Sequence, residues 1–213
     1  MKDLLIATTN KSKLAPFLYS CRLLDLDKLY RFISPKEAGI SVDVEENSGS
    51  FRGDSELKAR AYCTASGLTA VAFDRGIEFE ALGGWPGTES KKALAGDEKM
   101  ILGVDNQFET DVVNTQKLLD RLKNKENRTM YVGYGIAVAS PDGEMVSDKV
   151  RTRGTAANEL RITRLGYYFD WFFMPEGRVA ALSEMTPDEY DNYTATVLWP
   201  ITLPVAEALK KFS

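Results

Sequence analysis

Residues 71–87 read VAFDRGIEFEALGGWPG, and this stretch gives the clearest structural signals in the chain. A run of strand-forming residues leads to one carboxylate, Asp74, and a turn rich in glycine and proline follows at residues 83–87. We expect the strand to end at Asp74. Carboxylate oxygens bind Mg²⁺, which often bridges substrate phosphates. The stretch is therefore consistent with a metal or phosphate site, and equally with a hairpin that carries exposed acids.

The composition predicts a folded, soluble protein. Of the 213 residues 44% are apolar, which is enough for the core of one large domain or two small ones. The 27 basic and 31 acidic residues are well mixed, so the chain lacks the basic field of a nucleic-acid-binding protein. The N-terminus does not resemble a signal sequence, no apolar run could span a membrane, and two cysteines suit a reducing compartment. We expect a cytoplasmic protein with neither a nucleic-acid polymer nor a membrane as partner.

The chain contains no histidine. This absence excludes Ser-His and Cys-His catalysis and histidine-bound metals. Any acid–base or metal chemistry must come from carboxylates, lysines, tyrosines or metal-bound water.

Hydrophobic periodicity predicts an α/β fold, since helices alternate with strands in the first half and a hairpin follows in the second. Residues 91–107 show no clear periodicity and are expected to be irregular. The expected elements are a strand at 4–7, a helix capped by Ser12, a helix from Gly53 to Ser66, strands at 68–73 and 77–82, a helix capped by Asp111, a hairpin of strands at 130–139 and 144–153, and a closing helix with Pro204 in its first turn. The pattern predicts a mixed central sheet flanked by helices.

Two segments are candidates for binding phosphate. Residues 8–13 read TTNKSK and lie between the first strand and the first helix, where unpaired N–H groups and the helix dipole favour an anion. An ordinary capped junction is the simpler interpretation of that segment. Lys58, on the second helix, could hold a phosphate if this helix faces Asp74, and a solvated surface is the alternative.

Acidic and aromatic residues offer further candidates. Glu45 and Glu46 lie in a polar loop and could bind Mg²⁺ together with Asp74, although adjacent acids in loops are usually just solvated. Arg75 could pair with Asp74 or contact a substrate. Residues 166–174 are densely aromatic and could supply a ring that stacks on a base, although most of these rings belong to a core. Asp170 lies among them and must be hydrogen-bonded or exposed to a ligand.

Taken together, these segments resemble the inosine triphosphate pyrophosphatase family, whose members are non-canonical purine nucleoside triphosphate pyrophosphatases. The family pattern TGNxxK is similar to residues 8–13, with Thr9 in place of glycine. The patterns EExxxxF and LKAR match residues 45–51 and 57–60, and DDSGL followed by ALGGxPG is similar to residues 73–77 and 81–87. The resemblance runs from the N-terminus to about Glu184. The ordered series of motifs is far more specific than any one of them.

The resemblance implies one domain over residues 1–213, with an elongated, two-lobed fold, a site in the cleft between the lobes, and usually a homodimer. It also implies Mg²⁺-dependent hydrolysis of a nucleoside triphosphate to the monophosphate and pyrophosphate. By that analogy Glu45 and Asp74 hold the metal, and Asp74 or a metal-bound water activates the nucleophile. The residues expected to bind substrate are Thr8, Thr9, Asn10, Lys13, Lys58, Arg75, Phe169 and Asp170, with Asn10, Lys13 and Lys58 on the phosphates.

The acidic half of the expected site departs from the family pattern. Phe73 replaces the first acid of the family's pair, and Arg75 replaces its serine. Gly53 and Asp54 stand where the family has Glu-Asn. Fewer metal-site carboxylates are therefore expected.

The base-recognition half departs as well. Tyr190 replaces a late lysine, and TAT at residues 194–196 replaces the family's S-H-R triplet. We therefore expect a base preference altered from inosine or xanthosine. Two alternatives remain: a nucleotide-binding protein of the same fold with little or no turnover, and an interaction module in which the motifs are relics.

Overall fold

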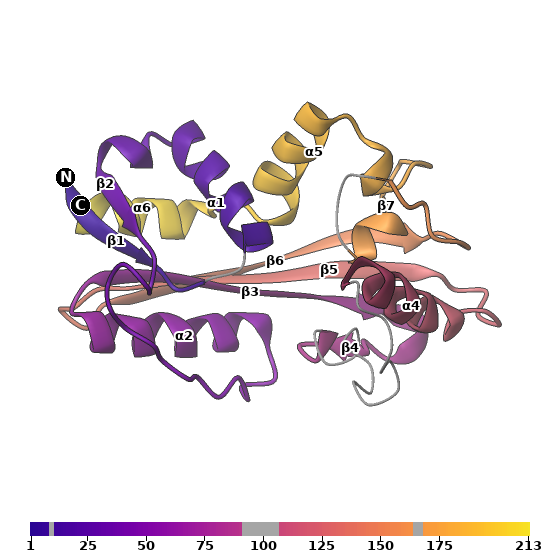
Figure 1. Ribbon diagram of the computed structural model, residues 1–213, viewed down its shortest axis with the longest axis horizontal. Coiled ribbons are helices and arrows are strands. Elements are labelled where there is room, and N and C mark those ends of the chain that lie inside the picture. The colour runs from indigo at the N-terminus through magenta and orange to yellow at the C-terminus, as the bar shows by residue number, and fades with distance from the viewer. Residues whose placement is uncertain (9–10, 91–106, 164–167) are drawn as a thin grey trace. The chain divides into compact units, whose positions relative to one another are not determined.

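The computed structural model describes residues 1–8, 11–90, 107–163 and 168–213 (Figure 1). The described strands form one mixed sheet in the order β2-β1-β3-β5-β6-β7, with β4 paired to β3. The strands are β1 (Lys2–Ile6), β2 (Tyr30–Ile33), β3 (Thr69–Phe79), β4 (Pro86–Gly87), β5 (Thr129–Ala139), β6 (Met145–Ala156) and β7 (Phe173–Pro175). The α-helices are α1 (Lys11–Leu23), α2 (Phe51–Ser66), α4 (Gln107–Asp120), α5 (Pro187–Tyr193) and α6 (Leu203–Phe212). The expected mixed sheet with helices on it is confirmed.

The chain divides into two compact units. The first comprises Met1–Arg75, Tyr134–Val150 and Asp191–Ser213, and the second comprises Gly76–Gly133 and Arg151–Tyr190. Strands β3, β5 and β6 contribute residues to both units. The single domain over residues 1–213, the elongated shape and the cleft stay predictions. No helix among the described residues combines the length and hydropathy needed to cross a bilayer.

In the first unit β1 runs parallel to both of its neighbours, with Leu4 opposite Phe32 of β2 and Leu5 opposite Ala70 of β3. Parallel neighbours require crossover connections, which α1 supplies between β1 and β2 and α2 supplies between β2 and β3. Helices α1 and α6 lie on one face of these strands and α2 lies on the other (Figure 1).

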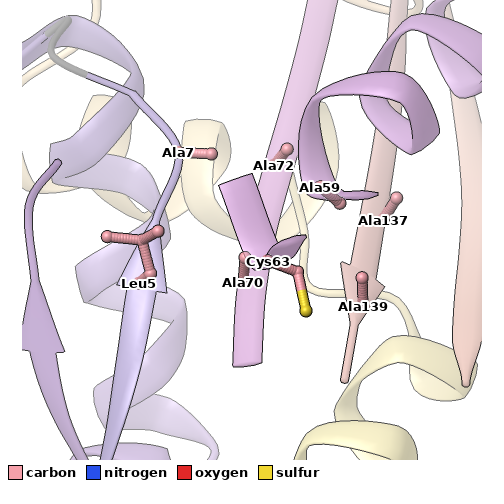
Figure 2. Packing of buried hydrophobic residues seen from close by; sticks show 8 residues of the cluster. All are labelled: Leu5, Ala7, Ala59, Cys63, Ala70, Ala72, Ala137 and Ala139. Atoms are coloured by element: carbon pink, nitrogen blue, oxygen red, sulfur yellow. The ribbon is translucent and has the colours of Figure 1, made fainter. Parts of the chain in front are cut away.

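Helix α2 packs on the sheet through small side chains. Ala59 and Cys63 of the helix are buried in one cluster with residues of β3 and β5, among them Ala70, Ala72 and Ala137 (Figure 2). Ser50 caps the helix by accepting a hydrogen bond from the Gly53 N–H at 3.1 Å. Because small residues keep the helix close to the strands, polar side chains at its N-terminal end are buried as well.

The N-terminus of α2 lies against the bare backbone of β5. A Cβ atom built on Gly135 would lie 2.2 Å from the Phe51 carbonyl oxygen, which is much closer than two non-bonded atoms can approach. Glycine is therefore required at this position by the close approach of two backbones.

The opposite face of β3 carries large aromatic residues. The Phe73 ring lies 5.5 Å from that of Phe17 in α1 and 6.4 Å from that of Tyr134 in β5, measured between centroids. Side chains alternate along a strand, so Phe73 faces α1 while Ala72 and Asp74 face α2.

In the second unit β4 forms a short hairpin with β3, with Ile77 opposite Gly87. Ser90 fixes this turn, because its buried hydroxyl accepts from the Ile77 N–H at 2.9 Å and donates to the Gly87 carbonyl at 2.5 Å. Strand β7 pairs antiparallel with β6, with Gly154 opposite Pro175.

Three expected boundaries are wrong. Strand β3 does not end at Asp74 but continues to Phe79, because the nearly continuous run of buried side chains carries on past the acid. Helix α1 begins at Lys11, so Ser12 lies inside it, and α4 begins at Gln107, so Asp111 is an interior residue. Of the residues 91–107 expected to be irregular, Gln107 begins α4, and 91–106 lie outside the described residues. The end of α2 at Ser66, the turn after β5 and the closing helix with Pro204 are confirmed.

Candidate functional site

Two lysines from different helices meet one carboxylate in the first unit. The Nζ atom of Lys58, on α2, lies 3.0 Å from Oδ1 of Asp74, and Nζ of Lys13, on α1, lies 3.4 Å from the same oxygen. Asp74 is only 6% exposed. A buried carboxylate is stabilised by cations and hydrogen bonds, so this charge cluster requires all three segments to fold together.

The ends of the strands explain how residues so distant in sequence meet. The pairing of β1 with β3 ends at Ile6 and Val71, and Asp74 lies three residues further along β3. Lys13 lies in the first part of the helix that follows β1. In open α/β sheets, ligands bind beyond the carboxyl ends of parallel strands, and this cluster lies at such an end.

Three carboxylates gather at this point. One oxygen each from Glu46, Asp54 and Asp74 lies within 4.8 Å of the other two. Asp54 lies in the first turn of α2, and Glu46 lies in the loop that precedes the helix. Lys58 joins two of the acids, since its Nζ also lies 2.5 Å from Oε2 of Glu46.

The three carboxylates fit Mg²⁺. This ion takes oxygen ligands in an octahedron of about 2.1 Å radius, in which neighbouring oxygens lie about 3 Å apart and opposite ones about 4 Å apart. The three carboxylate oxygens lie within 4.8 Å of one another, so small side-chain movements would bring them to these ligand–ligand distances. No nitrogen or sulfur ligand belongs to this cluster of described residues, which favours a hard cation.

Burial and charge act on the two lysines in different proportions. The pKa of Lys13 is lowered to about 8, mainly by burial and in part by the nearby cations Lys58 and Arg75, while the Asp74 carboxylate opposes them. Burial also disfavours the charged form of Lys58, but the Asp74 and Glu46 carboxylates outweigh it and raise the pKa of this lysine. Both lysines are therefore held as ammonium groups at neutral pH, Lys13 by the smaller margin.

Arg75 lies beside Asp74 in sequence, but its guanidinium stacks on a different partner. Its Cζ lies 4.0 Å from the centroid of the Trp199 ring. Stacking on an aromatic face holds a guanidinium in one orientation. Arg75 is not one of the residues of the acidic cluster, and its predicted contact with substrate stays a prediction.

The remaining residues predicted on the phosphate and metal side are found in different surroundings. Thr8 follows β1 directly, and its N–H donates to the Ile6 carbonyl at 2.7 Å. Thr9 and Asn10 lie outside the described residues. Glu45 is exposed and does not belong to the acidic cluster, whereas its neighbour Glu46 does. The geometry thus favours Glu46 over Glu45 as a metal ligand.

The residues predicted to contact a base lie in the second unit. Phe169 is buried, and its ring meets that of Phe173 edge to face at 6.5 Å. Asp170 is 2% exposed and accepts a hydrogen bond from the Tyr190 hydroxyl at 2.8 Å. Of the two alternatives expected for Asp170, a hydrogen bond or exposure to a ligand, the structure shows the hydrogen bond. A role for Phe169 and Asp170 in binding substrate stays a prediction.

Two acids of the cluster carried signals that the sequence reasoning did not use. Asp54 precedes Lys58 by four residues, so the acid and the candidate phosphate-binding lysine lie on one face of α2. Glu46 follows the half-buried Val42 and Val44 at even spacing, whereas Glu45 is in register with the exposed Asp43, although both glutamates are themselves exposed.

Comparison with known proteins agrees with the resemblance inferred from the sequence. The model of the Ham1 family matches residues 4–195. A dITP/XTP pyrophosphatase of Rhodopseudomonas palustris is 33% identical over 211 residues, which cover 98% of this chain and 91% of the relative. A dITP/XTP pyrophosphatase of Bacillus subtilis is 29% identical over 215 residues, which cover 100% of this chain and 96% of the relative.

Solved structures show the same fold. The Ham1 protein of Staphylococcus aureus aligns with a TM-score of 0.73 and 24% identity, over 99% of this chain and 97% of that one. A nucleoside-triphosphatase described as a dITP/XTP pyrophosphatase, from Mycobacterium abscessus, aligns with a TM-score of 0.67 and 26% identity, over 91% and 94% of the two chains. By sequence motifs, family model and fold alike, this chain belongs to the Ham1 family.

Proposed function

We propose that this chain is a Mg²⁺-dependent nucleoside triphosphate pyrophosphohydrolase, which releases the nucleoside monophosphate and pyrophosphate. The observation that carries the proposal is the cluster around Asp74, where Lys13 and Lys58 converge on one of three neighbouring carboxylates. Relatives named dITP/XTP pyrophosphatases support the type of reaction. The proposal includes a role in clearing unwanted nucleotides from the cell's pool.

The reaction needs charge neutralisation and an oriented water more than covalent chemistry. Bound Mg²⁺ would neutralise phosphate oxygens and lower the pKa of a coordinated water. Asp74 and Glu46 would hold this ion, and Asp74 would accept the proton of the attacking water. The water oxygen forms a bond to the α-phosphorus while the bond from that phosphorus to the bridging oxygen breaks, so pyrophosphate leaves.

The two lysines would bind the phosphates. In the structure Lys58 neutralises Asp74 and Glu46, so an arriving Mg²⁺–triphosphate would exchange partners with it. The cation takes the carboxylates and the ammonium takes phosphate oxygens. Lys13 would make a second phosphate contact from the other helix.

The acidic cluster retains three carboxylates although Phe73 replaces the first acid of the family's pair. Phe73 faces α1, between Phe17 and Tyr134, whereas the three clustered acids lie toward α2. This placement supports turnover over the alternative of a protein that binds nucleotide without hydrolysing it.

Altered base specificity is the finer part of the proposal. Where the family pattern has a lysine, Tyr190 offers a neutral hydroxyl that already donates to Asp170. The hydroxyl of Thr196, in the segment that replaces the S-H-R triplet, donates to the Asn192 carbonyl at 2.7 Å. Neither residue brings the positive charge that would favour the keto groups of inosine or xanthosine.

The central test measures pyrophosphate release from a panel of ribo- and deoxyribonucleoside triphosphates with Mg²⁺. We expect turnover by the native protein and a loss of 10²-fold or more in Asp74→Asn, with Asp43→Asn, an exposed acid of the loop before α2, as the matched control. A rate strongly selective for inosine or xanthosine triphosphate would overturn the altered preference. Nucleotide that raises the melting temperature of both proteins without pyrophosphate release would instead favour the non-hydrolysing alternative.

The family resemblance also suggests a homodimer and a cytoplasmic location. Light scattering during size-exclusion chromatography measures the mass directly, and twice the 23.7 kDa of one chain is the expected value.

A further inference from the structure

Asp54 is a buried acid without a cation of its own. It is 1% exposed, in the first turn of α2. Its carboxylate accepts one hydrogen bond, from the Ser48 N–H to Oδ1 at 3.0 Å, and no described lysine or arginine lies within ion-pair distance of it. Burying a carboxylate costs free energy unless a cation or several hydrogen bonds compensate, so this arrangement calls for a partner.

The charges around Asp54 indicate that its partner is a cation. Glu46 and Asp74 share the ammonium of Lys58, and Asp74 also receives Lys13. Three carboxylates therefore face two ammonium groups, with the third acid left over. Carboxylates this close repel one another when all are ionised, and a cation bound between them would offset this repulsion.

Asp54 is also bonded to the loop that carries another acid of the group. Its hydrogen bond holds the backbone of Ser48, two residues after Glu46 in the loop. One turn further along α2, Lys58 projects from the same helix face. The carboxylate is thus oriented by the fold toward Asp74, with one oxygen on the loop and the other not used in any hydrogen bond of the described residues.

We propose that Asp54 is a third carboxylate of the divalent-cation site and binds the ion together with Glu46 and Asp74. The inference rests on the proposed function in so far as that reaction supplies the reason for a cation. Relative to the family pattern, position 54 gains an acid while positions 53 and 73 each lose one, so Asp54 replaces only part of the lost negative charge. The expected ligand is a hard cation, Mg²⁺ or Mn²⁺, since only oxygen donors converge.

A purely structural role for Asp54 gives different expectations. If the carboxylate served only to accept the Ser48 N–H, an asparagine of the same shape would replace it without consequence, because its amide oxygen accepts the same bond. Asp54→Asn therefore removes the charge and retains the hydrogen bond, which separates the two roles.

The direct test titrates the nucleotide-free protein with Mn²⁺, followed by calorimetry and by the electron paramagnetic resonance of the free ion. We expect Asp54→Asn to weaken Mn²⁺ binding at least tenfold, Asp74→Asn to weaken it as much or more, and the exposed control Asp43→Asn to leave it unchanged. Native affinity in Asp54→Asn would overturn the proposal.

A second measurement compares melting temperatures in EDTA and in excess Mg²⁺. In EDTA we expect Asp54→Asn to melt at or above the native temperature, because an uncompensated buried charge is gone. In Mg²⁺ we expect the native protein to gain more than the variant, since stabilisation follows from binding to the folded state. Equal gains in the two proteins would contradict a role in holding the ion, whatever the temperature in EDTA.

The assay of pyrophosphate release distinguishes failure of this inference from failure of the proposed function. Weakened Mn²⁺ binding in Asp54→Asn with no turnover of any nucleotide by the native protein would support the cation site and refute the hydrolase. Turnover by the native protein with unchanged Mn²⁺ binding in Asp54→Asn would support the hydrolase and refute the third ligand.

Discussion

The ammonium of Lys58 lies 3.0 Å from Oδ1 of Asp74, the side chain that the proposed reaction needs as a metal ligand. A lysine and a divalent cation cannot both occupy the same side of one carboxylate oxygen. Lys58 would therefore neutralise Asp74 when no ion is bound and would give up this contact to a bound divalent cation. Competition between the two cations can be measured.

We expect Lys58→Met to have opposite effects on metal and on nucleotide. In EDTA the free energy of unfolding should fall by roughly 2–3 kcal/mol, because Asp74 loses a buried counter-ion. Mg²⁺ should restore most of this loss and bind more tightly than in the native protein, while kcat/KM for triphosphate falls by about 10²-fold. Urea unfolding with and without Mg²⁺ measures the first effect, with the exposed Lys36→Met as control. Weaker metal binding in Lys58→Met would contradict competition.

Restoring the family acid with Phe73→Asp should harm the protein. The new carboxylate would be buried between Phe17 and Tyr134, away from the acidic cluster. The lost packing and the buried charge together should cost more than about 3 kcal/mol, with no gain in affinity for Mn²⁺. Phe73→Leu, which keeps the site apolar, should cost less. Tighter Mn²⁺ binding by a folded Phe73→Asp protein would show that position 73 still faces the ion.

Gly135→Ala should disturb both stability and binding. The new methyl group would meet the Phe51 carbonyl oxygen at 2.2 Å, so α2 must move away from β5. We expect a loss of roughly 3 kcal/mol in unfolding free energy and weaker Mn²⁺ binding, because Asp54 and Lys58 move with the helix. The comparison is Gly143→Ala, where φ is +90° but no atom lies within 4 Å, so that only backbone strain of about 1 kcal/mol is expected. If the two variants lose equal stability, the contact with Phe51 does not matter.

The lowered pKa of Lys13, about 8, predicts a particular dependence of stability on pH in the absence of metal. Between pH 8 and the ordinary lysine value of 10.5, the unfolded chain binds this proton and the folded protein does not. Stability therefore rises with pH across that window. Relative to Lys13→Met, the native free energy of unfolding in EDTA should increase by an amount on the order of 1–2 kcal/mol from pH 8 to pH 10. Parallel pH curves for the two proteins would refute this.

The order of the elements was predictable because periodicity and caps are local properties. The end of α2 at Ser66 follows from Gly67, whose φ of 69° suits glycine. The end of β3 was mispredicted because Asp74 looked like a terminating acid, whereas the tertiary contacts of two lysines allow it to lie within a buried strand. Tertiary pairing of this kind leaves no local signal.

The residues of the site were predictable where they belong to motifs and unpredictable where they depend on tertiary contacts. Motif spacing selected Lys13, Lys58 and Asp74, and the structure brings them together. The choice between Glu45 and Glu46 and the part played by Asp54 depend on how the loop before α2 lies on the helix, where the Ser48 N–H donates a hydrogen bond to Asp54. No pattern of residue types encodes such a bond.

Two neighbouring residues of β3 lie in separate environments. Position 73 belongs to an aromatic interior and position 74 to a set of charges. Substitutions at one of these positions need not affect the other. A protein can therefore replace the acid at position 73 by an aromatic residue and retain the acid at position 74 that the proposed reaction uses. A search that scores the two as an indivisible signature would then discard working hydrolases.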